Sequence, residues 1–349
     1  MLNALLERVF QRLNTQNVEE VIARTNPKWS RGKKQKNKQD LLPDFLDLAD
    51  FIEEGEIEDF VEMAVMTNQK GWPAYTYRVR STEFFQTDQS EKFDSVPFQN
   101  HYIIILEDSC ETEDEYRFNL RIKEYAEKWR HGGVLNTDSL TAVYRIPVII
   151  NKIKEKLTIH AGNETIHDVV STYLKNNLNW PISQYTIREN INQTFQLGNA
   201  SYNTAIFLDF IYNRLSKHGI EVKFEEIKFD TEGRLQNSEG IKKITLNGSN
   251  ILSSQSACEY ITMGSSIIVF KLKMTYNNRN FSGAFSVKER DMDTLKIVVI
   301  DQFESEFKEE VMEIIQDCYI QMCTSGIYDM NETKRTLDTI YEKFARGIS

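Results

Sequence analysis

Glu226 and Lys228 are the residues of this chain whose types and spacing most readily suggest catalysis. They lie two residues apart in a predicted strand, so the carboxylate and the ammonium group are expected on the same face. Such a pair is half of a metal-dependent nuclease site, in which acids hold Mg²⁺ and the lysine positions the attacking water. The nearest upstream acid, Asp209, falls in a predicted amphipathic helix. An exposed ion pair on a strand explains Glu226 and Lys228 equally well.

A second group of ligating side chains flanks a predicted strand-to-helix turn: His160, Glu164, His167 and Asp168. Imidazole and carboxylate together bind Zn²⁺ or Mn²⁺. Their order is not His-Glu-x-x-His, however, and helix capping with acids in the first turn accounts for the carboxylates. We therefore predict no resident metal and no cofactor, with Mg²⁺ required only by the nuclease alternative.

Searches for phosphate-binding and nucleophile motifs are negative, since Gly-x-Gly-x-x-Gly, Gly-x-x-x-x-Gly-Lys-Ser/Thr and Gly-x-Ser-x-Gly do not occur. Gly264-Ser265, followed by Asp291 and Asp293, resembles the Gly-Ser and paired acids of a nucleotidyltransferase. A whole predicted hairpin separates the two parts, whereas the acids of such a site follow the Gly-Ser turn closely. These observations favour a protein without catalytic activity of its own.

Residues 28–38 form a compact basic segment in a chain whose net charge is -10. They include one aromatic side chain and no acid. A cationic segment suits phosphate, an acidic protein, or an acidic patch on a second copy of the chain. The alternative is a solvated linker between two helices. The candidate binding residues are Lys28, Trp29, Arg31, Lys33, Lys34, Lys36 and Lys38.

Composition limits the remaining classes of protein. The chain has 349 residues, of which 40% are hydrophobic and 27% charged, enough for a packed core in two or three domains. A pI of about 5.2 excludes a surface built to coat nucleic acid. We identify no secretory signal and no apolar run of the ~18 residues that span a bilayer. The four cysteines are scattered, which favours free thiols in a reducing cytoplasm.

The pattern of apolar residues divides the chain into three predicted parts. Residues 1–70 predict helices, with Leu5, Leu6 and Val9 on one apolar face. Acids cluster between two of these helices, where they would form ion pairs with the basic segment within the chain or across a dimer. These acids are Glu53, Glu54, Glu56, Glu58 and Asp59.

Residues 71–185 predict an α+β domain, because alternation at 75–80 and 116–122 and an apolar run at 101–106 indicate strands. Within it, residues 141–178 predict a ββα unit. A hairpin followed by a helix resembles, in topology only, the opening of a ubiquitin-like β-grasp domain, but the pattern favours a generic ββα unit.

Residues 186–349 predict a second α+β domain, with antiparallel strands, a hairpin turn at Asn277-Asn278-Arg279 and two closing helices. The whole chain is therefore α+β, with helices at both ends and mostly antiparallel sheet between them.

These observations lead us to expect a cytoplasmic, non-catalytic interaction or regulatory protein. Its basic segment would bind a protein partner or nucleic acid, homo-oligomers would form through the acidic residues, and no membrane would be involved. Rich usage of Asn, Ile and Lys suggests a microbial or viral gene, with host–virus conflict or mobile-element biology as the setting. The alternative remains a Mg²⁺-dependent nuclease or phosphoryl-transfer enzyme that uses Glu226 and Lys228, with Asp209.

Overall fold

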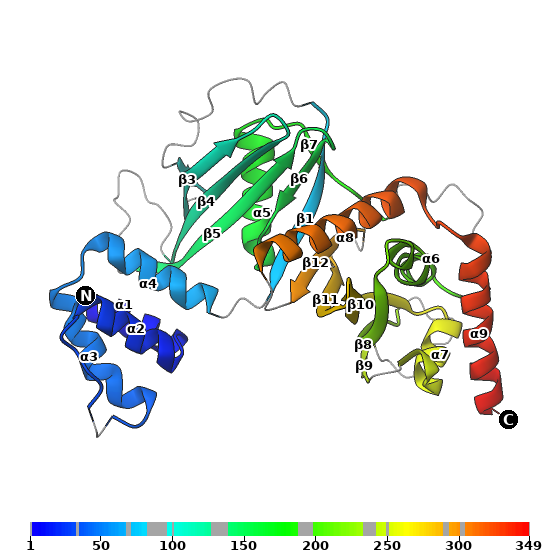
Figure 1. The fold of residues 1–349 in the computed structure, drawn as a ribbon, viewed down its shortest axis with the longest axis horizontal. Coiled ribbons are helices and arrows are strands. Elements are labelled where there is room, and N and C mark those ends of the chain that lie inside the picture. The colour runs from blue at the N-terminus through cyan, green and yellow to red at the C-terminus, as the bar shows by residue number, and fades with distance from the viewer. Residues whose placement is uncertain are drawn as a thin grey trace. The chain divides into compact units, whose positions relative to one another are not determined.

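The computed structural model describes residues 2–32, 35–67, 71–81, 96–99, 101–126, 139–187, 198–232, 242–248, 251–288, 293–300 and 304–348. By its internal contacts the chain forms two compact units (Figure 1). The first consists of Met1–Lys70 with Arg80–Pro181, and the second of Gly71–Val79 with Ile182–Ser349. The predicted 1–70 region thus belongs to the same unit as most of the predicted 71–185 domain. The division into three domains at 1–70, 71–185 and 186–349 stays a prediction.

The first unit begins with short helices. Asn14 caps the second of them, because its side chain accepts a hydrogen bond of 2.8 Å from the Asn17 amide. Pro43 follows in the first turn of a later helix, where its missing N–H costs nothing. The helical elements are α1 (Leu2–Arg12), α2 (Thr15–Thr25), η1 (Lys38–Leu41), α3 (Leu42–Leu46), η2 (Asp47–Asp50) and α4 (Glu54–Met66).

The same unit contains an antiparallel sheet in the order β2-β3-β4-β5-β6. The sheet is followed by α5 (Glu164–Thr172), which Asn163 caps and which continues into a π-helical turn, η6 (Tyr173–Asn177). The predicted ββα unit corresponds to β5, β6 and α5. The strands are β2 (Val96–Phe98), β3 (Tyr102–Glu111), β4 (Glu115–Tyr125), β5 (Leu140–Asn151) and β6 (Lys156–Ile159).

Helices α1 to α4 pack on the sheet of this unit in one hydrophobic cluster. The predicted apolar face of the first helix is buried, and it packs in a cluster that also includes Leu140 and Val143 of β5. Phe10 and Phe45 meet edge to face in this cluster, with ring centroids 5.5 Å apart. The helical region is thus fixed to the sheet by burial of apolar surface.

The second unit is built on an antiparallel sheet in the order β1-β12-β11-β10-β8-β9, and β7 (Ile182–Gln184) pairs with the end of β1. Asn277 and Asn278 connect β10 to β11 with φ of 50° and 61°, as a two-residue hairpin turn requires. The predicted turn is confirmed. The strands are β1 (Trp72–Val79), β8 (Glu221–Asp230), β9 (Lys243–Asn247), β10 (Ser266–Tyr276), β11 (Arg279–Val287) and β12 (Leu295–Ile300).

Helices pack against this sheet around a core of stacked aromatic rings, in which the Phe270 and Phe285 centroids are 4.7 Å apart. The helical elements are α6 (Tyr202–Asp209), its π-helical continuation η7 (Phe210–Leu215), η8 (Ile251–Ser253), α7 (Gln255–Thr262), α8 (Ser305–Ser325) and α9 (Met330–Ile348). The predicted α+β class is confirmed, with helices at the amino terminus, mostly antiparallel sheets and two closing helices. Among the described residues, no helix combines the length and the apolar character that crossing a membrane requires.

Candidate functional site

The basic segment lies between the end of α2 and η1, on the helical side of the first unit. Of its cations, Lys28, Arg31 and Lys36 are exposed and Lys38 is half-buried. Lys33 and Lys34 lie outside the described residues. The described part is held in place by contacts with helices on both sides of it.

Trp29 and Gln35 anchor the segment to one carboxylate. The Trp29 indole Nε1 donates to Asp44 Oδ2 at 2.6 Å, and the Gln35 amide Nε2 donates to the same oxygen at 2.7 Å. The Trp29 ring also packs against the core that α1, α3 and α4 share. Trp29 is therefore an anchor of the segment, and its ring is only partly available to a ligand.

Arg31 is occupied by contacts within its own neighbourhood. Its Nε donates to the Gln35 carbonyl at 2.8 Å and its Nη2 to the Lys36 carbonyl at 3.0 Å, while Nη1 pairs with Glu19 of α2. These hydrogen bonds join the Arg31 side chain to the backbone four and five residues later, so they hold the segment in a loop. Arg31 thus shapes the segment rather than offering a free charge.

Lys38 is turned toward the helices. Its ammonium donates to the Gln11 carbonyl at 3.1 Å and lies 4.8 Å from the centroid of the Phe10 ring. Burial lowers the pKa of Lys38. Lys28 and Lys36 are the exposed cations that, among the described residues of the segment, have ammonium groups without a hydrogen bond or ion pair.

The backbone around Lys36 is fixed by an acid that follows it. Asp40 Oδ2 accepts hydrogen bonds from the Lys36 amide at 2.8 Å and from the Asn37 amide at 2.9 Å. The sequence patterns did not identify Asp40 or Asp44 as anchors of the segment. The available signal was two acids placed shortly after a cationic stretch, a spacing that local side chain–backbone bonds use.

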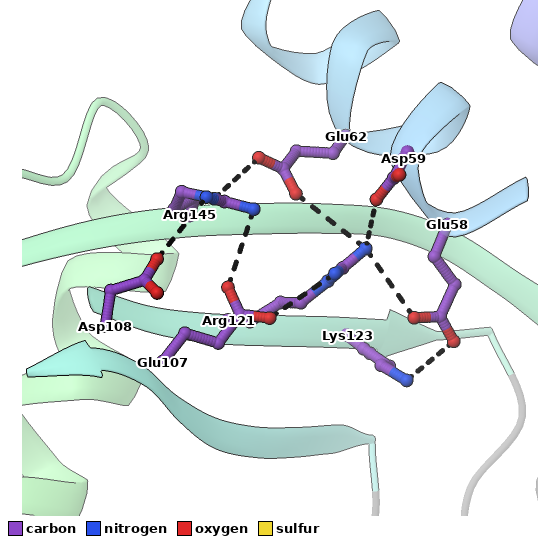
Figure 2. A network of polar contacts seen from close by, with 8 residues as sticks. All are labelled: Glu58, Asp59, Glu62, Glu107, Asp108, Arg121, Lys123 and Arg145. Atoms are coloured by element: carbon purple, nitrogen blue, oxygen red, sulfur yellow. Dashed lines mark hydrogen bonds and ion pairs between the residues drawn. The ribbon is translucent and has the colours of Figure 1, made fainter. Parts of the chain in front are cut away.

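Among the described residues, Glu58 and Asp59 pair with β4 instead of the basic segment, which corrects the expectation of contacts within the chain. The expectation of contacts across a dimer stays a prediction. Lys123 Nζ lies 2.6 Å from Glu58, and Arg121 Nη2 lies 2.9 Å from Asp59, both from β4 (Figure 2). Glu53 and Glu56 instead form a capping box at the start of α4. The Glu54 side chain lies outside the part of the chain that the structure describes.

Figure 2 shows that these pairs belong to one network between α4 and strands β3 to β5. Arg121 Nη1 lies 3.3 Å from Glu107, and Arg145 Nε lies 3.0 Å from Glu62. Glu58, Glu62 and Arg121 are each less than one fifth exposed. The network therefore holds the helical region on the sheet, and its charges are largely neutralised within it.

The nuclease alternative named Glu226, Lys228 and Asp209, and the fold does not bring the three together. Glu226 pairs with Lys271 of β10 at 2.6 Å. Ile227, between the two candidate residues, is buried in the core that contains the α6 side chains, so Glu226 and Lys228 point to the other face. Asp209 belongs to α6, across the sheet.

Asp209 is fully buried and has a structural set of partners. It accepts the amide N–H groups of Tyr328 and Asp329 at 2.8 and 3.0 Å, and it lies 3.4 Å from Arg214 Nε. It thereby fixes the link between α8 and α9. The nuclease alternative stays a prediction, and the placement of Asp209 does not add support to it.

The remaining candidate groups are dispersed. His167 Nδ1 lies 3.1 Å from its neighbour Asp168, and His160 is buried at the end of β6. Among the described residues, no three His, Cys, Asp or Glu side chains are close enough together to share a metal ion. Asp291 of the Gly-Ser pattern lies outside the described residues, and Ser265 is buried next to Thr204.

Comparison with known proteins gives no family for this chain. No protein-family model matches it, and a search of curated proteins finds no match.

Proposed function

We propose that this protein is a non-catalytic interaction or regulatory protein that binds an acidic protein partner through its basic segment, residues 28–38. The observation that supports this proposal is the combination of exposed Lys28 and Lys36 with a backbone held by Arg31, Asp40 and Asp44. A charged surface on a fixed backbone loses little conformational freedom when it binds. Its charges raise the rate of encounter with an acidic partner.

An acidic protein fits this segment better than nucleic acid does. The chain as a whole carries a net charge of -10, so a long polyanion is repelled by most of its surface. Binding to nucleic acid is driven by neutralising many phosphates. Two of the six cations are committed to internal contacts, which leaves a small cationic surface suited to a local acidic patch.

The proposed setting is the cytoplasm of a microbial or virus-infected cell, in host–virus conflict or mobile-element biology. Residue usage and the cysteine pattern support it. Homo-oligomers remain part of the proposal, although the acids of α4 are paired within the first unit and a second copy would have to offer other acids.

The experiment is a pull-down from native lysate in which the wild type is compared with Lys28→Glu/Lys36→Glu. The matched control is Lys334→Glu/Lys343→Glu, because both lysines are exposed on α9 and the change in net charge is the same. We expect one protein to be recovered with the wild type and the control, to be lost with the segment variant, and to resist nuclease treatment. If nucleic acid is recovered with the wild type alone, the ligand of the basic segment is nucleic acid and the proposed protein partner is refuted. Equal recovery with all three proteins would refute a binding role for Lys28 and Lys36.

A further inference from the structure

The first unit contains an open polar hollow of about 520 Å³, at the ends of β3, β4 and β5 and next to the last turns of α1 and α4. This volume lies within the range of sites that hold small molecules. The side chains that matter for its chemistry are Arg12, His101, Tyr102, Glu124, Thr141 and Tyr144.

The sheet register places three of these side chains together. Tyr102 of β3 lies opposite Glu124 of β4, and Glu124 lies opposite Ala142 of β5. Tyr144 follows Ala142 by two residues, so it points to the same face. One carboxylate and two phenol groups thus converge on one face of the sheet end.

The Glu124 carboxylate has one oxygen occupied and one available. The Tyr144 hydroxyl donates to Oε2 at 2.9 Å. Among the described residues, no lysine, arginine or histidine lies within ion-pair distance of Glu124. Burial raises the pKa of both Tyr102 and Tyr144, and the nearby Glu124 charge raises it further, so both phenols stay neutral. Glu124 therefore presents a negative charge without an ion-pair partner beside two aromatic rings, which is the environment that an ammonium group prefers.

His101 adds a second hydrogen-bond acceptor. Its Nδ1 lies 3.1 Å from the Tyr125 carbonyl oxygen. A carbonyl only accepts hydrogen bonds, so Nδ1 carries the hydrogen of the neutral ring and Nε2 has a free lone pair. His101 lines the same hollow as Glu124, and in this tautomer its Nε2 is the ring atom that accepts a hydrogen bond.

Arg12 supplies the opposite charge at the rim. Its Nη1 donates to the Thr141 carbonyl at 2.8 Å, which holds the exposed guanidinium next to β5. The remaining N–H donors of this group match the two oxygens of a carboxylate. A positive and a negative group therefore border the same hollow without pairing with each other.

We propose that this hollow binds a small zwitterion, with its ammonium group on Glu124 and His101 and its carboxylate on Arg12. The site is separate from the basic segment, and the proposal does not depend on the proposed function. Each of the three polar groups is presented by a backbone contact or by the sheet, so the site is formed before the ligand arrives.

The test is equilibrium dialysis of the full chain with ω-amino acids of increasing length, from glycine to 6-aminohexanoate, together with butylamine and butyrate. We expect one ω-amino acid to bind more tightly than either single-charge probe. Glu124→Gln should weaken that binding about tenfold or more, since a charge-assisted contact is lost. Arg12→Gln should reduce the affinity of the ω-amino acid to that of butylamine.

The controls separate the site from general charge and from folding. Glu113→Gln makes the same change in charge at an exposed turn and should bind as the wild type does. Tyr144→Phe keeps the Glu124 charge and should retain most of the affinity. The proposal is refuted if no probe binds below about 20 mM, if no ω-amino acid binds more tightly than both butylamine and butyrate, or if Glu124→Gln retains full affinity while its circular dichroism matches the wild type.

Discussion

Arg121 of β4 donates a hydrogen bond of 2.9 Å to Asp59 of α4, two residues that lie 62 positions apart in the chain. Burial by itself lowers the pKa of Arg121, but the hydrogen bond to Asp59 and the charges of Glu107 and Glu58 outweigh it and raise that pKa. The contact joins the helical region to the sheet of the first unit (Figure 2). The guanidinium therefore balances several carboxylates at once.

Arg121→Met is expected to destabilise the first unit by about 2–4 kcal/mol, because largely buried Glu58 and Glu62 and half-buried Glu107 lose the cation that they share. Among the described residues, each of these acids then keeps only Lys123 or Arg145. Asp59→Asn should cost less than about 1 kcal/mol, since Asp59 is 49% exposed. Urea unfolding of the two variants measures both values. A smaller loss for Arg121→Met than for Asp59→Asn would contradict the reading of Arg121 as the centre of the network.

The sequence predicted the strand that carries Arg121 but not the role of the residue. Alternation at 116–122 correctly placed the apolar residues on one face and the charged ones on the other. By pattern alone, the charged face of β4 is expected to meet solvent. That α4 covers it depends on packing between segments far apart in the chain, which no local period encodes.

Glu124 illustrates the same limit at the polar hollow. Alternation puts it on the face of Leu120 and Ile122, so a carboxylate stands at the end of an apolar row. A carboxylate at such a position is a sequence signal for a polar site, and the prediction did not use it. Tyr102 and Tyr144 come from two other strands, and only the register brings them to Glu124, while Arg12 reaches the same hollow from α1.

Tyr144→Phe should make the protein less sensitive to alkaline pH. The folded pKa of Tyr144 is raised above its ordinary value of 10.0 by burial and by Glu124, so its contribution to stability is complete below pH 10 and falls as the pH rises further. The slope of unfolding free energy against pH should become shallower by up to about 1.4 kcal/mol per pH unit above pH 10 in the variant. Urea titrations between pH 9 and 11 measure it. Identical slopes would mean that Tyr144 ionises equally in both states.

Asp209→Asn is expected to loosen the link between α8 and α9. In the variant, the amide N–H₂ group faces the backbone N–H groups of Tyr328 and Asp329, so a donor meets a donor. The variant also leaves buried Arg214 without its charge partner. Breaking a buried pair of this kind costs about 3–5 kcal/mol. Urea unfolding gives the loss, and amide hydrogen exchange at 326–333 should accelerate first. Unchanged exchange there would show that the α8–α9 link does not depend on this carboxylate.

Glu226→Gln tests the nuclease alternative without disturbing the core. Glu226 and Lys271 form a partly exposed ion pair, so the loss of stability should stay below about 1 kcal/mol. We expect neither the wild type nor the variant to cleave DNA or RNA with Mg²⁺ or Mn²⁺. Metal-dependent turnover by the wild type that Glu226→Gln abolishes, with the fold intact, would establish the enzyme and overturn the non-catalytic proposal.

Asp44→Ala separates two explanations of binding by the basic segment. The change removes the oxygen that accepts from Trp29 and Gln35, so amide exchange at 28–37 should become faster. It also removes one negative charge that contacts Trp29 and Gln35, the chain neighbours of Lys28 and Lys36. If charge alone governs the affinity for an acidic partner, the variant should bind more tightly than the wild type. If the fixed backbone matters, as we propose, the freed segment must be ordered on binding, and the affinity should fall by about three- to tenfold. Titration of the recovered partner with both proteins gives the sign of the change, and that sign decides between the two.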